Sequence, residues 1–532
     1  MKIKSLWISE YKNVQDFSLE FETELTSLLV GQNGLGKSNL LEAIALIFKD
    51  LDLIEDLDVF HNWPTQKDHF EYYITYYVKG KNITIVCKNR YFGVYELTQD
   101  EDVIYHKYID FGIFRKLKHE FLPDYIIGYY SGINHRIKQC FQEHYLSRVK
   151  NIRGRITAKY SLGKLFFTEQ NLGELLFFTL WVFKNSPSYS QKISSLFETY
   201  LKIELSSKIL ISFNNPEYFA RNKKYQNLSA ENIVENLIAE DPVEYPFWGL
   251  DGKLNGFFQA LWNNNLSNQE PIAFDDPDHS DDKNKISFLS FNDLNFETLF
   301  ENFRERGITS PLELFDILLE ANDLNIIYEI NSELAKDDGI ILHNYLELSE
   351  GEQQLLTVMG LILITSEYET LYLLDEPDTH LNPNWQRDYI QLLNDFNLQD
   401  RTSHIFVATH SPLLVQCVED LDEHKFDIIL YCRNEDGTID IENRPDIIKN
   451  WRIDQVLASK YFNIANTRPT NIDKFMAKRA ELLSKDNLTA EDYVFLKSIE
   501  ENDLLPSGET LNDFKAMHLI HKAVKRLPQE ND

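Results

Sequence analysis

Apolar residues gather near the start of the chain in short runs that polar turns separate. Ile3 to Ile8, Ser18 to Phe21 and Leu25 to Val30 are rich in β-branched, aromatic and aliphatic residues, which predicts three strands. From Lys37 to Phe48 leucine and isoleucine recur at helical spacing on one face. The expected order is therefore two strands, a third strand that runs into a glycine-rich turn, and a helix.

A hairpin and a further apolar strand follow. Phe70 to Val78 and Ile83 to Cys87 are β-branched and aromatic, and a short turn around Gly80 joins them. Tyr125 to Tyr130 is another apolar run, and it ends at a serine and a glycine. These runs predict an antiparallel hairpin and one more buried strand.

The middle of the chain, from Ile133 to Asp338, is mixed and mostly helical. Amphipathic helices are expected at Leu172 to Phe183, Lys192 to Leu205 and Leu254 to Trp262. The acidic, proline-broken loop from Phe274 to Asp282 is the best candidate for a linker or an insertion. No strand flanks this loop in the pattern, so its aspartates are expected to be solvated and not to bind a metal.

Two short buried strands, Leu371 to Leu374 and His404 to Ala408, indicate a return to α/β structure, and the chain beyond Trp451 is helical and charged. The predicted fold class is α/β, with a mixed sheet flanked by helices, an antiparallel hairpin subdomain, a mostly helical insertion and a helical tail. The predicted segments are residues 1–132 (first lobe), 133–338 (insertion), 339–450 (second lobe) and 451–532 (tail).

Composition excludes several classes of protein. Acidic residues outnumber basic ones, 84 against 53, and the formal charge of −31 argues against a nonspecific nucleic-acid coat. The four cysteines lie far apart, which argues against a disulfide framework or a zinc site. No apolar run is long enough for a membrane span, and the first residues lack the apolar core of a secretory signal. A cytoplasmic protein is expected.

The turn after the third predicted strand has the spacing of a phosphate-binding loop, GxxxxGK[ST]. It follows an apolar strand and opens a helix, which is the context that the motif requires. Its glycines let backbone N–H groups surround phosphate oxygens, and the helix N-terminus adds a positive dipole. Lys37 is expected to contact the β- and γ-phosphates of ATP, and Ser38 to ligate Mg²⁺. The candidate nucleotide-binding residues of this turn are Asn33, Gly34, Gly36, Lys37, Ser38 and Asn39.

A pair of carboxylates follows the predicted strand at Leu371 to Leu374. Asp375 stands at the polar end of that strand, where its carboxylate is expected to hold Mg²⁺ with its water shell. Glu376 comes next and is the candidate general base for the attacking water. An acidic turn at a strand end has many other uses, and it is the phosphate-binding loop that favours the catalytic interpretation.

Three further motifs resemble those of ABC-type ATPases. Leu348 to Gln354, LSEGEQQ, resembles their signature motif, Asp378 to Pro383 resembles their D-loop, and His410 resembles their switch histidine. The motifs also follow the order of that family. A serine and a glutamate at this spacing alone would only predict a helix cap. The resemblance is to RecF, SMC and OLD-like heads, and it implies Ser349, Gly351 and Glu352 as nucleotide contacts and His410 as a catalytic residue with Lys37 and Glu376.

In the family that these motifs resemble, the signature of one head completes the ATP site of another. One phosphate-binding loop and one signature in this chain therefore imply a homodimer, or a higher homo-oligomer, with ATP between the heads. The family also has a glutamine that senses Mg²⁺; Gln139 is a candidate that the sequence does not support further.

Scattered patches resemble a narrower group. They are Tyr125 to Gly132, Tyr245 to Gly249 and Trp451 to Ser459, with Thr467-Arg468-Pro469. The group is the AAA family ATPases of bacterial anti-phage and restriction-associated systems, and the ATPase subunits of Septu, retron-linked Septu and PARIS are the nearest that can be named. Simple packing of core or loop residues explains each patch equally well.

That resemblance implies a slow ATP hydrolase that controls a separate effector. About 120 residues follow His410, too few for a Toprim domain beside a helical tail, and HNH and zinc-hook motifs are absent. The chain is therefore expected to have no nuclease activity of its own and to act with an HNH-like or Toprim-like nuclease. A RecF-like or SMC-like repair ATPase that clamps nucleic acid is the alternative, and an ATP-binding scaffold is a third.

One stretch reverses the overall charge. Between Arg136 and Lys164 eight basic residues face a single acidic residue of the stretch, Glu143. Such a stretch indicates either a nucleic-acid contact, a solvated helix face or a contact with another subunit. The sequence leaves these three interpretations open.

Overall fold

The structure is a computed structural model of the 532-residue chain. It divides into two compact units, Met1–Ile453 and Asp454–Asp532. The description below covers residues 1–21, 26–55, 70–100, 103–132, 136–153, 163–168, 172–205, 208–213, 230–238, 246–265, 272–275, 287–397, 403–420, 426–433, 439–443, 448, 450–464, 473–483 and 489–501.

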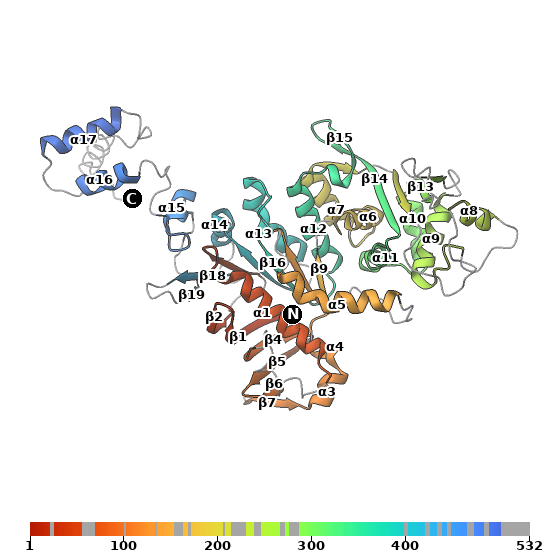
Figure 1. Cartoon of the computed structure of the whole chain (residues 1–532), viewed down its shortest axis with the longest axis horizontal. Helices are drawn as coiled ribbons and strands as arrows, with labels where there is room; N and C mark the ends of the chain where they lie inside the picture. Colours follow the sequence, from red (N-terminus) through yellow and green to blue (C-terminus); the bar gives the residue numbers. More distant parts are fainter. Residues whose placement is uncertain are drawn as a thin grey trace, which may run out of the picture. The chain divides into compact units, whose positions relative to one another are not determined.

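A seven-stranded sheet forms the centre of the first unit (Figure 1). Its strand order is β19-β18-β3-β17-β16-β8-β9, and every neighbouring pair is parallel except β18 and β19. The three middle strands, β3, β17 and β16, are buried at every position, as expected for parallel strands that are covered on both faces. The bounds are β3 Thr26–Gly31, β8 Tyr125–Tyr130, β9 Leu165–Thr168, β16 Thr370–Asp375, β17 His404–Thr409, β18 Phe426–Arg433 and β19 Ile439–Asn443.

The antiparallel subdomain is a six-stranded sheet of order β2-β1-β4-β5-β6-β7. The predicted hairpin is confirmed as β4 and β5, whereas β6 and β7 were not predicted from the sequence. The bounds are β1 Lys2–Tyr11, β2 Val14–Glu20, β4 Tyr72–Val78, β5 Lys81–Lys88, β6 Tyr91–Asp100 and β7 Val103–Ile109, and the short helices α3 Phe111–Lys116 and α4 Lys118–Phe121 follow them.

Helix α1, Lys37–Leu53, lies between these two sheets (Figure 1). Its apolar residues join one hydrophobic core with residues of β1, β4 and β5 and with Leu371 and Phe406 of the central sheet. A helix that is covered on two sides cannot rotate without exposing one set of apolar side chains. The position of the phosphate-binding loop, which opens α1, is therefore set by both sheets.

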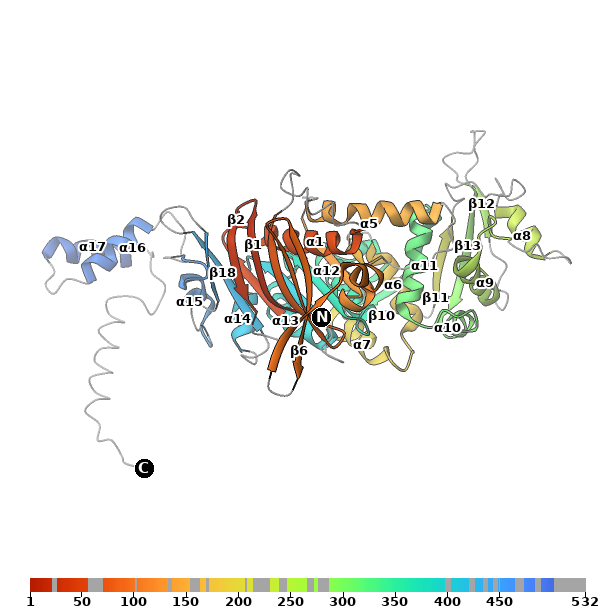
Figure 2. The same ribbon diagram turned by 90° about the horizontal axis from the view of Figure 1, so that it is seen from below.

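Helices α6 Gly173–Phe183, α12 Glu350–Ile364, α13 Pro383–Asn397 and α14 Pro412–Asp420 pack together in a further layer. α6 and α12 are apolar almost throughout, and nearly all their residues are buried. Helix α5, Arg136–Arg153, packs on α1 and extends beyond it toward α11 (Figure 2). The predicted ATPase-head fold is confirmed by this arrangement of sheets and helices.

The insertion contains a sheet as well as helices. Six antiparallel strands pair there in the order β10-β14-β11-β13-β12, with β15 beside β14. The bounds of the strands are β10 Ile203–Leu205, β11 Lys208–Phe213, β12 Ile272–Asp275, β13 Ser287–Asn295, β14 Ile327–Lys336 and β15 Ile341–Asn344. The helices are α7 Ser190–Ser194, the π-helix Ser195–Leu201, α8 Ala230–Ile238, α9 Gly252–Asn265, α10 Phe296–Glu305, α11 Pro311–Asp323 and the 3₁₀ helix Tyr345–Glu347.

Two expectations for this region are wrong. The helix predicted over Lys192 to Leu205 ends at Leu201, where Lys202 takes a left-handed backbone and Ile203 begins β10. The acidic loop is flanked by strands, since β12 ends at Asp275 and β13 begins at Ser287. Residues 276–286, with the remaining aspartates of the loop, lie outside the described residues.

The second unit contains helices α16, Asp473–Leu483, and α17, Ala490–Glu501. The rings of Phe475 and Phe495 stack between them with centroids 6.4 Å apart. Helix α15, Ile453–Ala458, begins at the junction of the units. The part of the predicted helical tail beyond residue 501 lies outside the described residues. Within the ranges described, no helix is both long and apolar enough to cross a membrane.

A buried histidine joins the two sheets. The backbone N–H of Ile3 on β1 donates to His404 Nδ1 at 3.1 Å, and His404 Nε2 lies 2.9 Å from the Ser27 hydroxyl oxygen on β3. His404 is fully buried, and burial lowers its pKa to about 3. The neutral ring fits this site because a proton on Nδ1 would face the Ile3 N–H group.

We predict that His404 makes the folded state sensitive to acid. The unfolded chain protonates this side chain as the pH falls through about 6.5, whereas the folded chain resists protonation down to about 3. Stability from this group is thus complete above pH 6.5 and declines below it, by about 2 kcal/mol at pH 5. In urea unfolding, the stability difference between the wild type and His404→Gln should shrink by that amount from pH 7 to pH 5. His106→Gln, on exposed β7, is the control, and parallel pH profiles for wild type and His404→Gln would contradict the prediction.

Candidate nucleotide site

The turn between β3 and α1 is the phosphate-binding loop predicted from the sequence. Gly34 and Gly36 both have left-handed backbones, with φ of 80° and 105°. A Cβ at Gly36 would lie 2.7 Å from Asn13 Oδ1, so only glycine fits there. Asn13, from the turn between β1 and β2, also donates to the Gly34 carbonyl at 2.9 Å and accepts from the Asn39 side chain. Asn33 is exposed on the turn.

Lys37 is folded back onto its own loop. Its Nζ donates to the carbonyl oxygens of Gly31 at 2.7 Å and Gln32 at 3.2 Å, and it lies 3.0 Å from His410 Nε2. Burial lowers the pKa of Lys37 to about 8, and the nearby carboxylates of Asp375 and Glu376 oppose that shift. Because a buried ammonium is costly without a negative partner, this position favours an anion such as a phosphate.

Ser38 and Asp375 form the predicted metal pair. Asp375 ends β16 with 3% of its surface exposed, and the Ser38 hydroxyl hydrogen-bonds its carboxylate. Burial raises the pKa of Asp375 to about 6. A hydroxyl oxygen and a carboxylate oxygen in contact fit the hard-oxygen preference of Mg²⁺. The raised pKa indicates that a cation would stabilise the ionised form of this carboxylate.

Glu376 sits on a strained turn at the end of the strand. Its φ is 50°, a backbone conformation that costs free energy for a residue with a side chain and often occurs at functional sites. Its N–H donates to the Ala408 carbonyl at 2.8 Å, and its own carbonyl accepts from the Ser131 hydroxyl at 2.7 Å. Glu376 Oε1 lies 3.4 Å from His410 Nε2, and a hydrogen bond with His410 lowers the pKa of Glu376. The carboxylate is thus kept ionised, as a general base must be.

The D-loop and the loop of the switch histidine are tied together. Thr409 Oγ1 donates to the buried Asp378 carboxylate at 2.9 Å, and the Ser411 hydroxyl donates to Gln386 Oε1 at 2.8 Å. Burial raises the pKa of Asp378 to about 6. These contacts hold His410 between Lys37 and Glu376.

Several residues near this cluster were not predicted. Ser131 follows β8, the strand beside β16, and its hydroxyl donates to the Glu376 carbonyl. Gln139, the candidate glutamine, lies instead on α5, along the wall of a separate cavity. Glu42 on α1 is 1% exposed at its side chain and pairs with Lys12 and with Arg136, whose Nε is 3.6 Å away. Two features of the sequence could have indicated these residues. Ser131 directly follows an apolar strand, and Glu42 is an acidic residue within the apolar face of a helix.

The signature residues begin α12. Ser349 is the N-cap, and its side chain and that of Glu352 bond each other's backbone N–H groups, which forms a capping box. Glu352 also pairs with Lys336 Nζ at 2.7 Å. A Cβ at Gly351 would lie 2.6 Å from the carbonyl oxygen of His380 in the D-loop. Within the part of the chain that the structure describes, Ser349 and Glu352 bond each other, Gln353 and Lys336, and none of these partners belongs to the phosphate-binding loop.

The basic stretch is partly used in ion pairs within the chain. Arg136 pairs with Glu42, Arg148 with Asp323, and Lys164 with Asp52 at 3.7 Å. Lys138 and Lys150 are exposed on α5. The side chain of Arg153, with Arg155 and Lys159, lies outside the described residues. The stretch therefore contributes to packing as well as to the surface.

The strand-end cluster, the phosphate-binding loop, and the separate signature helix define an ABC-type P-loop ATPase head. A family model described as "AAA ATPase domain" matches residues 1–415, and the chain belongs to that family.

Other comparisons are more limited. The chain is 27% identical over 148 residues to the "Septu protein PtuA" of Bacillus thuringiensis, a match that covers 27% of this chain and 34% of that protein's length. This match confirms the predicted resemblance to the ATPase subunits of Septu systems. The SMC head domain of Thermotoga maritima aligns with 83% of this chain and 99% of its own, at 13% identity and a TM-score of 0.31. The Smc head with an extended coiled coil from Pyrococcus furiosus aligns with 83% and 96%, also at 13% and 0.31.

We predict that Gly351→Ala destabilises the junction of the signature and the D-loop. The new methyl group would meet a backbone carbonyl, which cannot rotate away, so the cost is about 1–3 kcal/mol. Thermal unfolding should show a lower midpoint, and ATP turnover should fall because α12 shifts against the D-loop. Gly360→Ala, in the same helix, is the matched control: its Cβ meets Leu180 and Leu176 at ordinary distances of 3.5 to 3.7 Å. That variant should be as stable as the wild type or slightly more stable, and equal midpoints for both variants would contradict the prediction.

Proposed function

We propose that this chain is the ATPase subunit of a bacterial anti-phage defence system and that it controls a separate, nuclease-like effector from the cytoplasm. Two findings support the proposal: membership of the AAA ATPase domain family and the partial similarity to a Septu protein. The effector would be an HNH-like or Toprim-like nuclease. The chain itself would hydrolyse ATP slowly and would not cut nucleic acid.

The observation that carries the mechanism is the separation of two half-sites in one chain. Lys37, Asp375, Glu376 and His410 are gathered at the ends of the parallel strands, whereas the hydrogen bonds of Ser349 among the described residues join it to Glu352 and Gln353 of its own helix. In this proposal the N-terminus of α12 from a second copy supplies the remaining donors to the nucleotide. Two heads then close on two ATP molecules.

The surface beside the signature suits such an interface. Leu346, just before the motif, is 66% exposed, and Ile340 and Ile341 at the start of β15 are 52% and 57% exposed. Three large aliphatic side chains exposed near one motif favour contact with another protein surface. Burying them against a second head would contribute hydrophobic free energy to dimer formation.

Within each site the proposed roles follow from the positions described. Mg²⁺ would lower the charge of the triphosphate and polarise the scissile bond, with Ser38 and Asp375 as its protein ligands. Lys37, released from the Gly31 and Gln32 carbonyls, would turn its ammonium group to the β- and γ-phosphates. Glu376 would accept the proton of the attacking water, and His410 would orient that carboxylate. Loss of the γ-phosphate would remove the contact to Ser349 and open the dimer.

The alternative, a RecF-like or SMC-like clamp on nucleic acid, requires a cationic groove. Arg148 and Lys164 are engaged with Asp323 and Asp52 and are largely buried, which leaves fewer free cations than the sequence indicated. The anti-phage proposal is therefore preferred. Duplex binding that weakens steeply with salt would favour the clamp instead.

We predict that two inactive variants restore activity when mixed. Lys37→Ala removes the phosphate-binding amine, and Ser349→Arg blocks the signature; each should be inactive alone. A mixed dimer has one site built from two intact halves. Random mixing makes half the dimers mixed, with one working site of two, so turnover should recover to about a quarter of the wild type. Absence of recovery, with both variants folded, would contradict a shared site.

A second prediction concerns the state of association. Glu376→Gln keeps the shape of the side chain but removes the base, so ATP should remain bound. Light scattering after size exclusion should show a larger mass for this variant with ATP and Mg²⁺ than without nucleotide. Glu376→Gln combined with Ser349→Arg is the control and should keep one mass in both conditions. The same mass for Glu376→Gln with and without ATP would contradict ATP-dependent dimer formation.

A further inference from the structure

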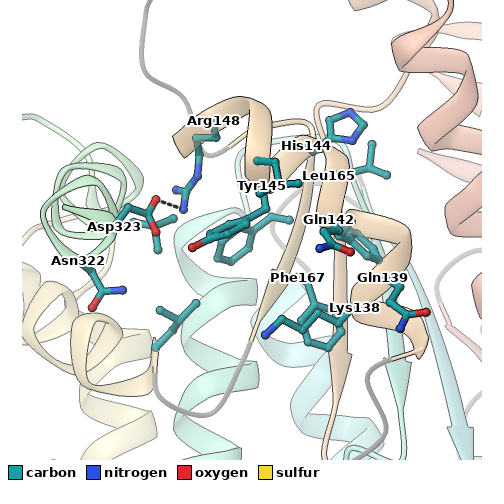
Figure 3. Close-up of a pocket in the computed structure, with 15 residues that line it drawn as sticks. Lys138, Gln139, Gln142, His144, Tyr145, Arg148, Leu165, Phe167, Asn322 and Asp323 are labelled. Carbon is teal, nitrogen blue, oxygen red and sulfur yellow. Dashed lines mark ion pairs between the residues drawn. The ribbon is translucent and has the colours of Figure 1, made fainter. Parts of the chain in front are cut away.

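Helix α5 borders a cavity in addition to packing on α1. Its first part runs beside α1, where Arg136 pairs with Glu42, Glu143 with Lys49, and His144 with Asp52. The partners advance together along both helices, so α5 and α1 are parallel. Beyond His144 the helix continues toward α11 (Figure 2). A cavity lies along α5 from Lys138 to Arg148, between this helix, β9 and α11 (Figure 3).

The cavity has the size of a site for a small organic ligand. Its volume is about 510 Å³, within the range of about 300–1,000 Å³ that is usual for such sites. Phe166, Phe167 and Leu319 make an apolar wall, and Tyr145 contributes a ring that is 51% exposed. An aromatic ring that is held on a helix and half open to solvent offers a flat face for stacking.

The polar groups around this wall are of two kinds. The side-chain amides of Gln139, Gln142 and Asn322 each present both donors and acceptors. Lys138 and Arg148 carry fixed positive charges on the same lining, and the Arg148 guanidinium lies 6.0 Å from the Tyr145 ring centroid (Figure 3). A purely apolar ligand would leave the amides unused, and a simple anion would not need the aromatic wall.

Acidic residues of α11 only partly offset these cations. Asp323 pairs with Arg148, and on the same helix Glu320 is buried and Asp316 is half-buried. Burial raises the pKa of Asp316 to about 6 and that of Glu320 to about 8. Glu320 is therefore mainly neutral at pH 7, and Arg148 keeps donors for a further anion because a guanidinium has five N–H groups.

We infer that this cavity binds a nucleotide unit, with its base stacked on Tyr145, the base edge on the amides, and its phosphate near one of two cations, Lys138 or Arg148, which lie about 15 Å apart along α5. The unit comes either from a free mononucleotide or from the end of a single-stranded nucleic acid, since both present the same base and phosphate. The site is separate from the phosphate-binding loop, and it does not depend on the proposed dimer or on the effector.

Binding can be measured on the full-length protein with AMP, GMP, CMP and UMP and with a 5′-phosphorylated single-stranded oligonucleotide. At least one probe should bind, and Tyr145→Ala should raise its Kd about tenfold or more, because stacking on one aromatic ring is lost. Tyr105→Ala, which removes an exposed tyrosine of β7 (44% exposed), is the matched control and should bind as the wild type does. Tighter binding of the oligonucleotide would identify a strand end as the source, and tighter binding of a mononucleotide would identify the free form.

Photolabelling distinguishes this cavity from the ATP site and does not depend on any variant. 8-Azido-AMP should label the α5 segment Arg136–Arg153, and an excess of AMP should prevent that labelling. Label found only in Gly31–Asn39, a Kd for Tyr145→Ala equal to that of the wild type, or no binding of any probe at millimolar concentration would overturn the inference.

Discussion

The register of the parallel strands is the constraint on which the site depends. Asp375 pairs with Ala408 on β17 and with Tyr130 on β8, and Thr409 pairs with Val30 on β3. The carboxyl ends of β3, β8, β16 and β17 therefore meet at one edge of the sheet. The residues that follow these strands lie together there, although they come from distant parts of the chain. Because successive side chains of a strand face opposite sides, a shift of one residue would turn Asp375 away from Ser38.

Charge is concentrated at that edge and is incompletely balanced without a ligand. A lysine with a lowered pKa faces one aspartate with a raised pKa, while His410 keeps Glu376 ionised. Burial is the main cause of the pKa shifts of both Lys37 and Asp375. A phosphate beside Lys37 and a cation beside Asp375 would therefore each offset the free energy that burial of the charge costs. The charges at this edge thus favour an anion beside Lys37 and a cation beside Asp375.

Helices extend this edge into the rest of the first unit. α1 carries the phosphate-binding loop between two sheets, and α5 is fastened along it by three ion pairs before it reaches α11. α12 carries the signature and meets the D-loop where Gly351 approaches the His380 carbonyl. A movement of either helix would therefore displace residues at the strand ends through direct contacts.

Local signals determined much of this protein. The glycine-rich turn, the Asp375-Glu376 pair and the signature were recognisable because each depends on a few neighbouring residues whose backbone or chemistry is special. The hairpin and most buried strands followed from short-range apolar patterns. Tertiary structure alone decided the rest: that Asn13 braces Gly36, that Ser131 supports Glu376, and that His404 joins two sheets. These contacts join residues far apart in the chain, and no local pattern encodes which strand will lie beside which. The sheet of the insertion was not predicted for the same reason. Most of its strands pair across long connections, and their apolar and polar residues alternate only weakly.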